Sequence, residues 1–167
     1  MQNQMNKYRR LKNLFLRQSY LDAWEDYQRS ILKKSFPKWD YIVLTASNEE
    51  QGKAFQKQIE YRSEKGVLPD ATKFLVIPDP DGKRIGSGGA TLHVLRTLSE
   101  REGFLGDFHG KRILVIHSGG DSKRVPQYSV CGKLFSPVPR ELPDGRGSTL
   151  FDEFLIGMSG VPSRFKE

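Results

Sequence analysis

The sequence predicts an α/β fold, with a mostly parallel, Rossmann-like sheet flanked by helices. Three short runs rich in branched apolar residues are expected to be strands: "YIVLTAS" (Tyr41 to Ser47), "KFLVIP" (Lys73 to Pro78) and "ILVIH" (Ile113 to His117). Continuous apolar runs are typical of strands covered on both faces, and segments with helical periodicity alternate with them. That alternation predicts parallel strands joined by helical crossovers.

The first element is expected to be a long helix. Leu11, Leu14, Leu21, Trp24 and Ile31 recur at roughly helical spacing, and "FPKWD" ends the pattern. We therefore divide the chain into an N-terminal helical segment, residues 1–36, and the beginning of an enzyme domain, residues 37–167.

Helices are also expected after each strand. Ser47 and Glu50 have the spacing of a capping box before a helix with Phe55 and Ile59 on its apolar side. A turn-rich loop, "DPDGKRIGSGG" (residues 79–89), precedes a helix that starts at Ala90 and has Leu92, Leu95 and Leu98 on one side. After a proline-rich connection, "STLFDEFLIGM" is expected to be the last helix, with a capping box formed by Thr149 and Asp152.

Composition limits the possible functions. The chain has 167 residues, 37% of them apolar and 28% charged, a single cysteine, Cys131, and a net charge of +7. No run is apolar enough for a membrane span or a signal peptide, and no nucleic-acid-binding motif accompanies the positive charge. The positive charge fits an enzyme for small polyanionic substrates as well as it fits a nucleic-acid-binding protein, so charge alone decides nothing. The single cysteine predicts a reducing, cytoplasmic setting, and we expect neither a nucleic acid nor a membrane as partner.

The first glycine cluster is Gly86-Ser87-Gly88-Gly89. It lacks the Gly-Lys-Ser/Thr ending of a Walker loop, and Thr91 stands where a dinucleotide fingerprint requires its third glycine. Two interpretations stay open. The cluster either presents backbone N–H groups to an anion at a helix N-terminus or forms a tight turn that needs positive φ angles.

The second cluster is part of "ILVIHSGGDSKRVPQYSVCGK", where Gly119 and Gly120 follow a buried strand. Arg124 adds a planar cation with several donors, Pro126 stiffens the loop, and Lys133 adds a compact charge. Each residue alone fits a solvated surface loop. As a spaced set after a strand, they favour a cage for phosphates, the group whose transfer depends mainly on positioning and charge neutralisation.

These motifs resemble those of sugar nucleotidyltransferases. "YIVLTAS", "IPDPDGKRIGSGGATL", "HSGGDSKRVP" and "GKLFSPVPR" together are most similar to the pyrophosphorylase region of bifunctional fucokinase/GDP-fucose pyrophosphorylases, over at least Trp39 to Arg140. The more common signature has Gly-Thr before the arginine. Here Ser122-Lys123 stands in that place, which leaves the role of Lys123 open.

The resemblance implies roles for particular residues. Arg124 and Lys133 would be catalytic, by balancing charge on the leaving pyrophosphate. Nucleotide binding would fall to Gly119, Gly120 and Ser122 in one loop, and to Gly86, Gly88 and Gly89 in a second.

The resemblance also implies a Mg²⁺ ion held by an acidic residue. Asp121 is a weak candidate, because it would compete with the phosphates for the same cations. Asp152 and Glu153 are expected to be first-turn acids of a helix, so the metal ligand is expected beyond residue 167. The chain would then be an N-terminal, truncated part of a larger polypeptide with sugar-binding and kinase regions, inactive alone.

The reaction implied by the resemblance joins GTP and fucose 1-phosphate to give GDP-fucose and pyrophosphate. The attacking phosphate is already ionised near neutral pH, so no general base is needed, and His93 and His117 are given no catalytic role. One alternative is a non-catalytic nucleotide-binding or assembly module left by truncation. A dehydrogenase-type dinucleotide domain is disfavoured, by Thr91 and by the lack of an acidic residue after the following strand.

Overall fold

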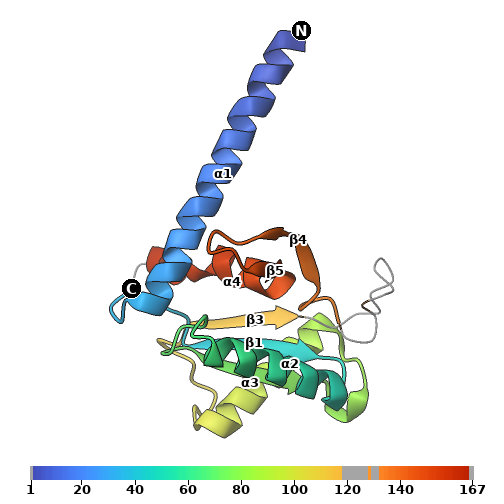
Figure 1. Ribbon diagram of the computed structural model, residues 1–167. Coiled ribbons are helices and arrows are strands. Elements are labelled where there is room, and N and C mark those ends of the chain that lie inside the picture. Colours follow the sequence, from blue (N-terminus) through green and yellow to red (C-terminus); the bar gives the residue numbers. More distant parts are fainter. Residues whose placement is uncertain (1, 118–127, 129–131, 166–167) are drawn as a thin grey trace.

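The computed structural model describes residues 2–117, 128 and 132–165. Its centre is a parallel sheet of three strands in the order β2-β1-β3 (Figure 1). The strands are β1 (Tyr41–Ala46), β2 (Lys73–Pro78) and β3 (Ile113–His117). The predicted α/β class is therefore confirmed.

The central strand, β1, is buried along its whole length. Val43 pairs with Leu75 of β2 on one side and with Val115 of β3 on the other, so apolar side chains of all three strands are in register. Burial on both faces explains why the sequence of β1 is a continuous apolar run and not an alternating one.

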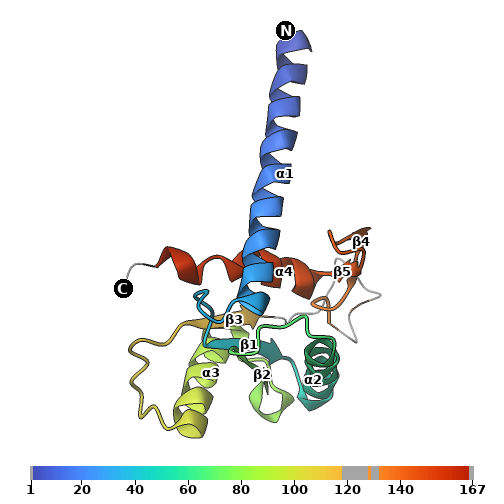
Figure 2. The same cartoon turned by 60° about the vertical axis from the view of Figure 1, so that its left-hand side comes forward.

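Helices cover both faces of the sheet. Helix α2 (Glu49–Glu64) connects β1 to β2 and packs Phe55 and Ile59 against one face. Helix α3 (Gly86–Glu102) connects β2 to β3 and packs Val94 and Leu98 against the other (Figure 2). The first connection runs from β1 to β2 on one side of it, and the second crosses over β1 to reach β3 on its other side. The strand order thus reverses at β1, which makes the carboxyl end of β1 a topological switch point.

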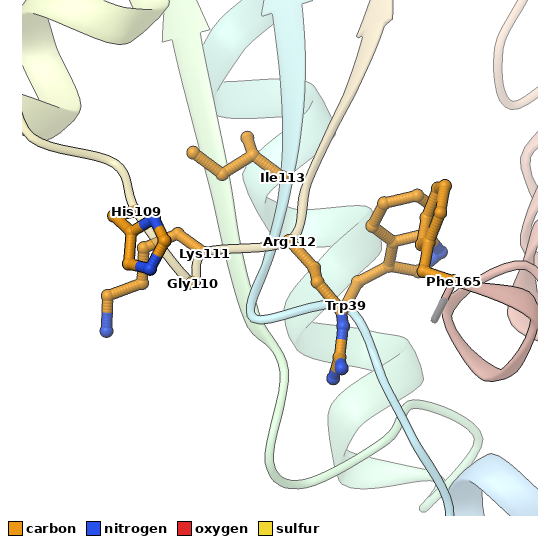
Figure 3. A pocket seen from close by; sticks show the side chains of 7 residues that line it. All are labelled: Trp39, His109, Gly110, Lys111, Arg112, Ile113 and Phe165. Atoms are coloured by element: carbon orange, nitrogen blue, oxygen red, sulfur yellow. The ribbon is translucent and has the colours of Figure 1, made fainter. Parts of the chain in front are cut away.

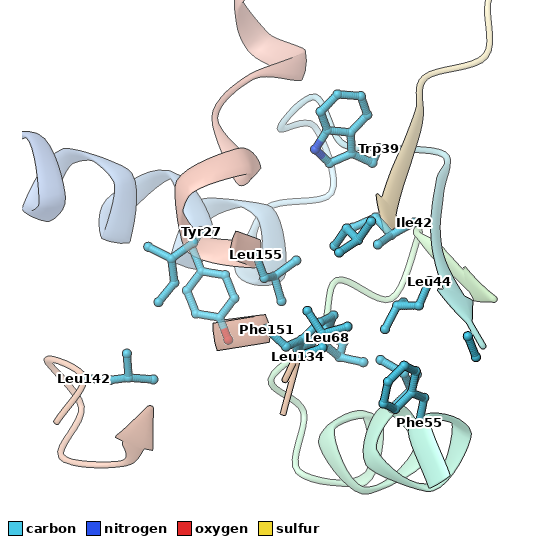
Figure 4. Close-up of a cluster of buried hydrophobic side chains, with 14 of the residues drawn as sticks. Tyr27, Trp39, Ile42, Leu44, Phe55, Leu68, Leu134, Leu142, Phe151 and Leu155 are labelled. Atoms are coloured by element: carbon cyan, nitrogen blue, oxygen red, sulfur yellow. The ribbon is translucent and has the colours of Figure 1, made fainter. Parts of the chain in front are cut away.

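The face covered by α2 also receives α4 (Leu150–Ser159) and the C-terminal part of α1 (Gln2–Leu32). Figure 4 shows this core cluster, in which Phe151 and Leu155 of α4 lie near Ile42 and Leu44 of β1. The rest of α1 extends away from the body (Figure 1). No helix in the described part of the chain is both long enough and apolar enough to cross a membrane.

The proline-rich connection contains a hairpin that we did not predict. Strand β4 (Pro137–Glu141) pairs antiparallel with β5 (Gly147–Thr149), with an irregular register between Val138 and Glu141. Asp144-Gly145 forms its turn, where Gly145 has a φ of 83°. Prolines are tolerated in β4 because it is an edge strand. The Asp-Gly pair was the feature of the sequence that could have predicted the hairpin.

Two predicted details of the helices are wrong. The cap of α2 is Asn48, not Ser47: the Asn48 side chain accepts a hydrogen bond from the Gln51 N–H at 2.8 Å. In α3, Leu98 is buried as expected, but Leu92 is exposed, and Ala90 and Val94 complete the buried side. The capping box of Thr149 and Asp152 at the start of α4 is confirmed.

Candidate functional site

A small cleft opens at the carboxyl edge of the parallel sheet, at the switch point. It has a volume of about 110 Å³ and is lined by residues from the ends of all three strands and the start of α3: Thr45, Asp79, Arg84, Gly86, Ser87, Ala90 and His117. Ligands of open α/β sheets bind at this edge, so its position alone marks the cleft as the candidate site.

The first glycine cluster forms one wall of this cleft, but it is not a loop. Gly86–Gly89 make the first turn of α3, which begins four residues earlier than predicted. The difference arises at Gly86, whose φ of 71° lets the chain turn directly into the helix. The residue before it, Ile85, makes no side-chain capping bond to the first turn of α3.

Gly88 and Gly89 differ in how much space surrounds them. A methyl group added at Gly88 would meet no atom within 4 Å, whereas one at Gly89 would lie 3.0 Å from Ile85 Cβ. Packing therefore explains a glycine at position 89. At position 88 the described structure gives no packing reason, which leaves room for close approach of a ligand.

The opposite wall is fixed by His117 at the end of β3. Its Nε2 lies 3.1 Å from Thr91 Oγ1, and the Thr91 hydroxyl donates to the Ser87 carbonyl at 2.9 Å. Because that hydroxyl has a single proton, His117 Nε2–H is the donor to Thr91. His117 thus links β3 to the first turns of α3.

Lys133 is carried by a short turn that lies against α2. A methyl group on Gly132, which has a φ of 76°, would fall 2.9 Å from both Gln51 Nε2 and Phe55 Cζ, so only glycine fits this close approach. Gln51 Oε1 in turn accepts from the backbone N–H of Ser47 at 2.9 Å. The Lys133 turn therefore lies beside the carboxyl end of β1, the same strand end that supplies Thr45 to the cleft.

The N-terminus of α4 holds this turn from its other side. The N–H of Phe151 donates to the Leu134 carbonyl at 2.7 Å, and that of Leu150 donates to the Ser136 carbonyl at 3.1 Å. Ser136 also donates to the carbonyl of Lys133 through both its N–H, at 2.9 Å, and its hydroxyl, at 2.7 Å. The backbone of Lys133 is thereby tied to a helix that follows it in the chain.

A buried ion pair joins α2 to α4 behind the turn. Arg62 Nε donates to Asp152 Oδ1 at 2.9 Å, and the guanidinium lies 4.9 Å from the ring centre of Phe135 and 5.4 Å from that of Phe151. Burial alone would raise the pKa of Asp152, but hydrogen bonds from Arg62 and Thr149 outweigh it and hold that pKa below 3.8. Asp152 is thus a structural carboxylate, as expected of a first-turn acid.

The remaining predicted site residues lie outside the described residues. These are Gly119, Gly120, Asp121, Ser122 and Arg124. Among the residues that are described, no group of three histidine, cysteine or acidic side chains could hold a metal ion. Asp79 provides a carboxylate in the cleft.

Sequence reasoning missed Thr45, Asp79, Arg84 and Ser87 as cleft residues. A signal for Asp79 was present, because it directly follows β2 and its N–H continues the ladder to the Ala46 carbonyl at 2.7 Å. A polar residue directly after a buried parallel strand lies at the ligand-binding edge.

A larger hollow, of about 740 Å³, lies at the opposite, amino edge of the sheet (Figure 3). Trp39 and Phe165 form an edge-to-face pair on one side of it, 6.4 Å between ring centres, and Lys111 and Arg112 precede β3. None of the predicted site residues lines it. Its place at the amino ends of the strands argues against it as the nucleotide site.

Comparison with known proteins agrees with the motifs. Residues 106–167 match the model of the fucose pyrophosphorylase domain family. This part of the chain is similar to the fucose pyrophosphorylase domain. The matched range contains the second glycine cluster, the Lys133 turn and the N-terminus of α4.

Curated proteins of the fucose pyrophosphorylase group are similar over a wider range. The chain is 39% identical over 152 residues to a bifunctional fucokinase/GDP-fucose pyrophosphorylase of Arabidopsis thaliana, an alignment covering 78% of the chain and 14% of the relative. It is 40% identical over 102 residues to a fucose-1-phosphate guanylyltransferase of Mus musculus, covering 60% of the chain and 17% of the relative. The chain thus spans less than a fifth of the length of these relatives. No solved structure matches it.

Proposed function

We propose that this chain forms the nucleotide-binding part of a fucose-1-phosphate guanylyltransferase, which converts GTP and fucose 1-phosphate to GDP-fucose and pyrophosphate. The observation that carries the proposal is the match of residues 106–167 to the fucose pyrophosphorylase domain, because this range contains the glycine, arginine and lysine motif. Relatives named for the same activity support it.

The phosphates are assigned to the carboxyl edge of the sheet. The first turn of α3 offers backbone N–H groups that its N-cap residue, Ile85, does not cap, beside the positive end of the helix dipole. The Lys133 turn lies at the end of β1 nearby. Gly119, Gly120 and Ser122 are assigned to orient the triphosphate, with Gly86, Gly88 and Gly89 approaching the nucleotide from α3.

Arg124 and Lys133 are the residues proposed to act in the chemical step. The sugar phosphate attacks the α-phosphorus of GTP in line, and the bond to the β-phosphate oxygen breaks as the new P–O bond forms. Negative charge develops on the leaving pyrophosphate, where a fixed cation lowers the barrier most. The hydrogen bonds of the turn and the close packing of Gly132 fix the backbone from which the Lys133 side chain extends.

Magnesium is proposed as the cofactor. Mg²⁺ commonly takes only one or two protein carboxylates and completes its shell with waters and substrate phosphates. Asp79 is a carboxylate in the cleft and could supply one such ligand, with Asp121 as the weaker candidate from the sequence. When bound, the ion would neutralise phosphate charge. The single cysteine favours a reducing, cytoplasmic setting.

The test uses two lengths of protein. In a full-length guanylyltransferase that contains this chain, Lys133→Ala should lower turnover by ~10²-fold, the usual loss of one preorganised charge-stabilising donor. Arg124→Lys should also impair turnover, because the planar fork is lost while the charge stays. Lys53→Ala, on the exposed side of α2, is the matched control and should leave turnover unchanged.

The isolated chain is tested for binding by calorimetry. It should bind GTP weakly, gain little from Mg²⁺ and form no GDP-fucose. Nucleotide binding by the chain, together with a full-length protein that releases no pyrophosphate, would favour the non-catalytic binding module. Normal turnover in both the Lys133 and Arg124 variants would remove these residues from the mechanism.

A further inference from the structure

Helix α3 begins with a turn that has almost no side chains of its own. Residues 86–89 are Gly-Ser-Gly-Gly, and glycine is the least favourable helical residue after proline. The buried side chains of α3 start at Ala90 and continue with Val94 and Leu98. Packing against the sheet therefore reaches only the C-terminal end of the first turn, and a turn of this composition frays unless other contacts hold it.

Two hydrogen bonds supply such contacts. The Thr91 hydroxyl donates to the Ser87 carbonyl at 2.9 Å and accepts from His117 Nε2 at 3.1 Å. The first bond holds a carbonyl of the glycine turn, and the second holds the same hydroxyl to the last residue of β3. The first turn of α3 is thereby joined to the carboxyl end of a strand through a single side chain.

The position of His117 in the sequence gives this link a further meaning. Only Ser118 separates His117 from Gly119, so the strand that leads into the second glycine cluster is bonded to the helix that begins with the first. We infer, on the basis of the proposed function, that Thr91 and His117 form a positioning pair for the nucleotide. The pair acts through the backbone of residues 86–89 and contacts no reacting atom.

The order of the first turn decides what it can bind. Its N–H groups are not capped by the side chain of Ile85, and in a formed helical turn they point together out of the helix end, where a phosphate binds. In a frayed turn these groups no longer converge, and ordering them during binding lowers the affinity. The positioning pair therefore raises the affinity for the nucleotide by forming the turn before the nucleotide arrives.

The size of the effect follows from the surroundings of the pair. His117 is exposed, so water competes for its hydrogen bond, and losing one such bond corresponds to about a fivefold change in an equilibrium constant. The change should appear in the KM for GTP and not in kcat, because the turn is proposed to hold the nucleotide equally in the ground state and in the transition state.

Hydrogen exchange of the 167-residue chain without ligand tests the ordering of the turn. In a helix that begins at Gly86, the Ala90 N–H donates to the Gly86 carbonyl, so its exchange reports whether the first turn is formed. Thr91→Val keeps the shape of the side chain but removes both hydrogen bonds, and should speed this exchange about fivefold. Thr91→Ser keeps the hydroxyl and should restore the original rate. Thr97→Val, the same substitution further along α3, is the matched control and should leave the rate unchanged.

Steady-state kinetics of a full-length guanylyltransferase that contains this chain test the effect on the nucleotide. Thr91→Val should raise the KM for GTP about fivefold, while kcat and the KM for fucose 1-phosphate change by less than about twofold. His117→Ala should have the same effect, and the double variant should be no worse than either single variant, because the two residues act as one unit. His117→Gln, whose amide N–H can replace Nε2–H, should recover most of the loss.

The results that overturn the inference differ from those that overturn the proposed function. An unchanged KM for GTP in Thr91→Val, even with faster exchange at Ala90, would leave the pair a purely structural link. Additive effects of the Thr91 and His117 substitutions, or a loss that Thr91→Ser does not restore, would also overturn the inference. In each case a protein that still forms GDP-fucose and still loses turnover in Lys133→Ala keeps the proposed function. An unchanged full-length protein that forms no GDP-fucose would overturn the proposed function, and the inference with it.

Discussion

Replacing Arg62 with Ala should be among the most damaging single changes outside the cleft. The Arg62 and Asp152 side chains are only 9% and 10% exposed, and Arg62 also bonds Thr149 at 3.1 Å. The variant leaves a buried carboxylate without its cation, a change that typically costs 3–5 kcal/mol. Taken as about 4 kcal/mol, this is a large share of the 5–15 kcal/mol by which domains are stable.

Urea unfolding followed by circular dichroism measures this loss. With an m-value of about 2 kcal/mol/M, the midpoint should fall by about 2 M. Arg96→Ala is the matched control, because its ion pair with Glu100 is exposed on both sides, and its midpoint should barely move. A midpoint shift for Arg62→Ala as small as that of the control would refute the claim that a buried pair joins α2 to α4.

Four further substitutions test other features. Asp152→Asn should make the stability of the fold less sensitive to acid. Because the pKa of Asp152 is lowered in the folded state, its carboxylate contributes stability that is complete above pH 3.8 and is lost as the pH falls through the lower folded-state pKa. Acid unfolding curves that coincide with those of the unchanged chain would contradict this. Gly88→Ala should weaken nucleotide binding without lowering the melting temperature, because a methyl group there meets no other atom. Gly86→Ala should instead cost about 1 kcal/mol of stability, because Gly86 has a positive φ. A melting temperature lowered equally by both substitutions would favour a purely structural turn. Tyr27→Phe should cost about 1 kcal/mol by removing the hydrogen bond to the Val67 carbonyl at 2.7 Å. Burial raises the pKa of Tyr27, as it does those of Tyr20 and Tyr41, so ultraviolet titration of the variant should show one phenol fewer ionising above 10.0 than titration of the unchanged chain.

The strands were predictable because each is a run rich in branched apolar residues. The second and third match their predicted ranges, and the first ends one residue earlier than predicted, at Ala46. The start of α3 was not predictable in the same way, since three glycines in four residues favour a loop by propensity. Packing of Ala90, Val94 and Leu98 against the sheet overrides that propensity.

The candidate site was predictable only in outline. The rule that ligands bind at the carboxyl ends of parallel strands places the first glycine cluster and Lys133 at one edge of the sheet. The sequence could not show that the support for Lys133 comes from Gln51, Phe55 and the first N–H groups of α4, because these contacts join segments more than ten residues apart. The partner of Arg62, 90 residues further along the chain, was likewise hidden.

The hydrogen bonds between α4 and the Lys133 turn make α4 a reporter of ligand binding at that turn. A ligand that binds only when this turn is ordered must, by thermodynamic linkage, stabilise the interactions that order it. The amide hydrogens of Leu150 and Phe151 are the ones that bond to this turn. Their exchange with solvent should therefore slow when a triphosphate binds, so occupancy of the nucleotide site becomes measurable at a helix outside it, without any chemical turnover.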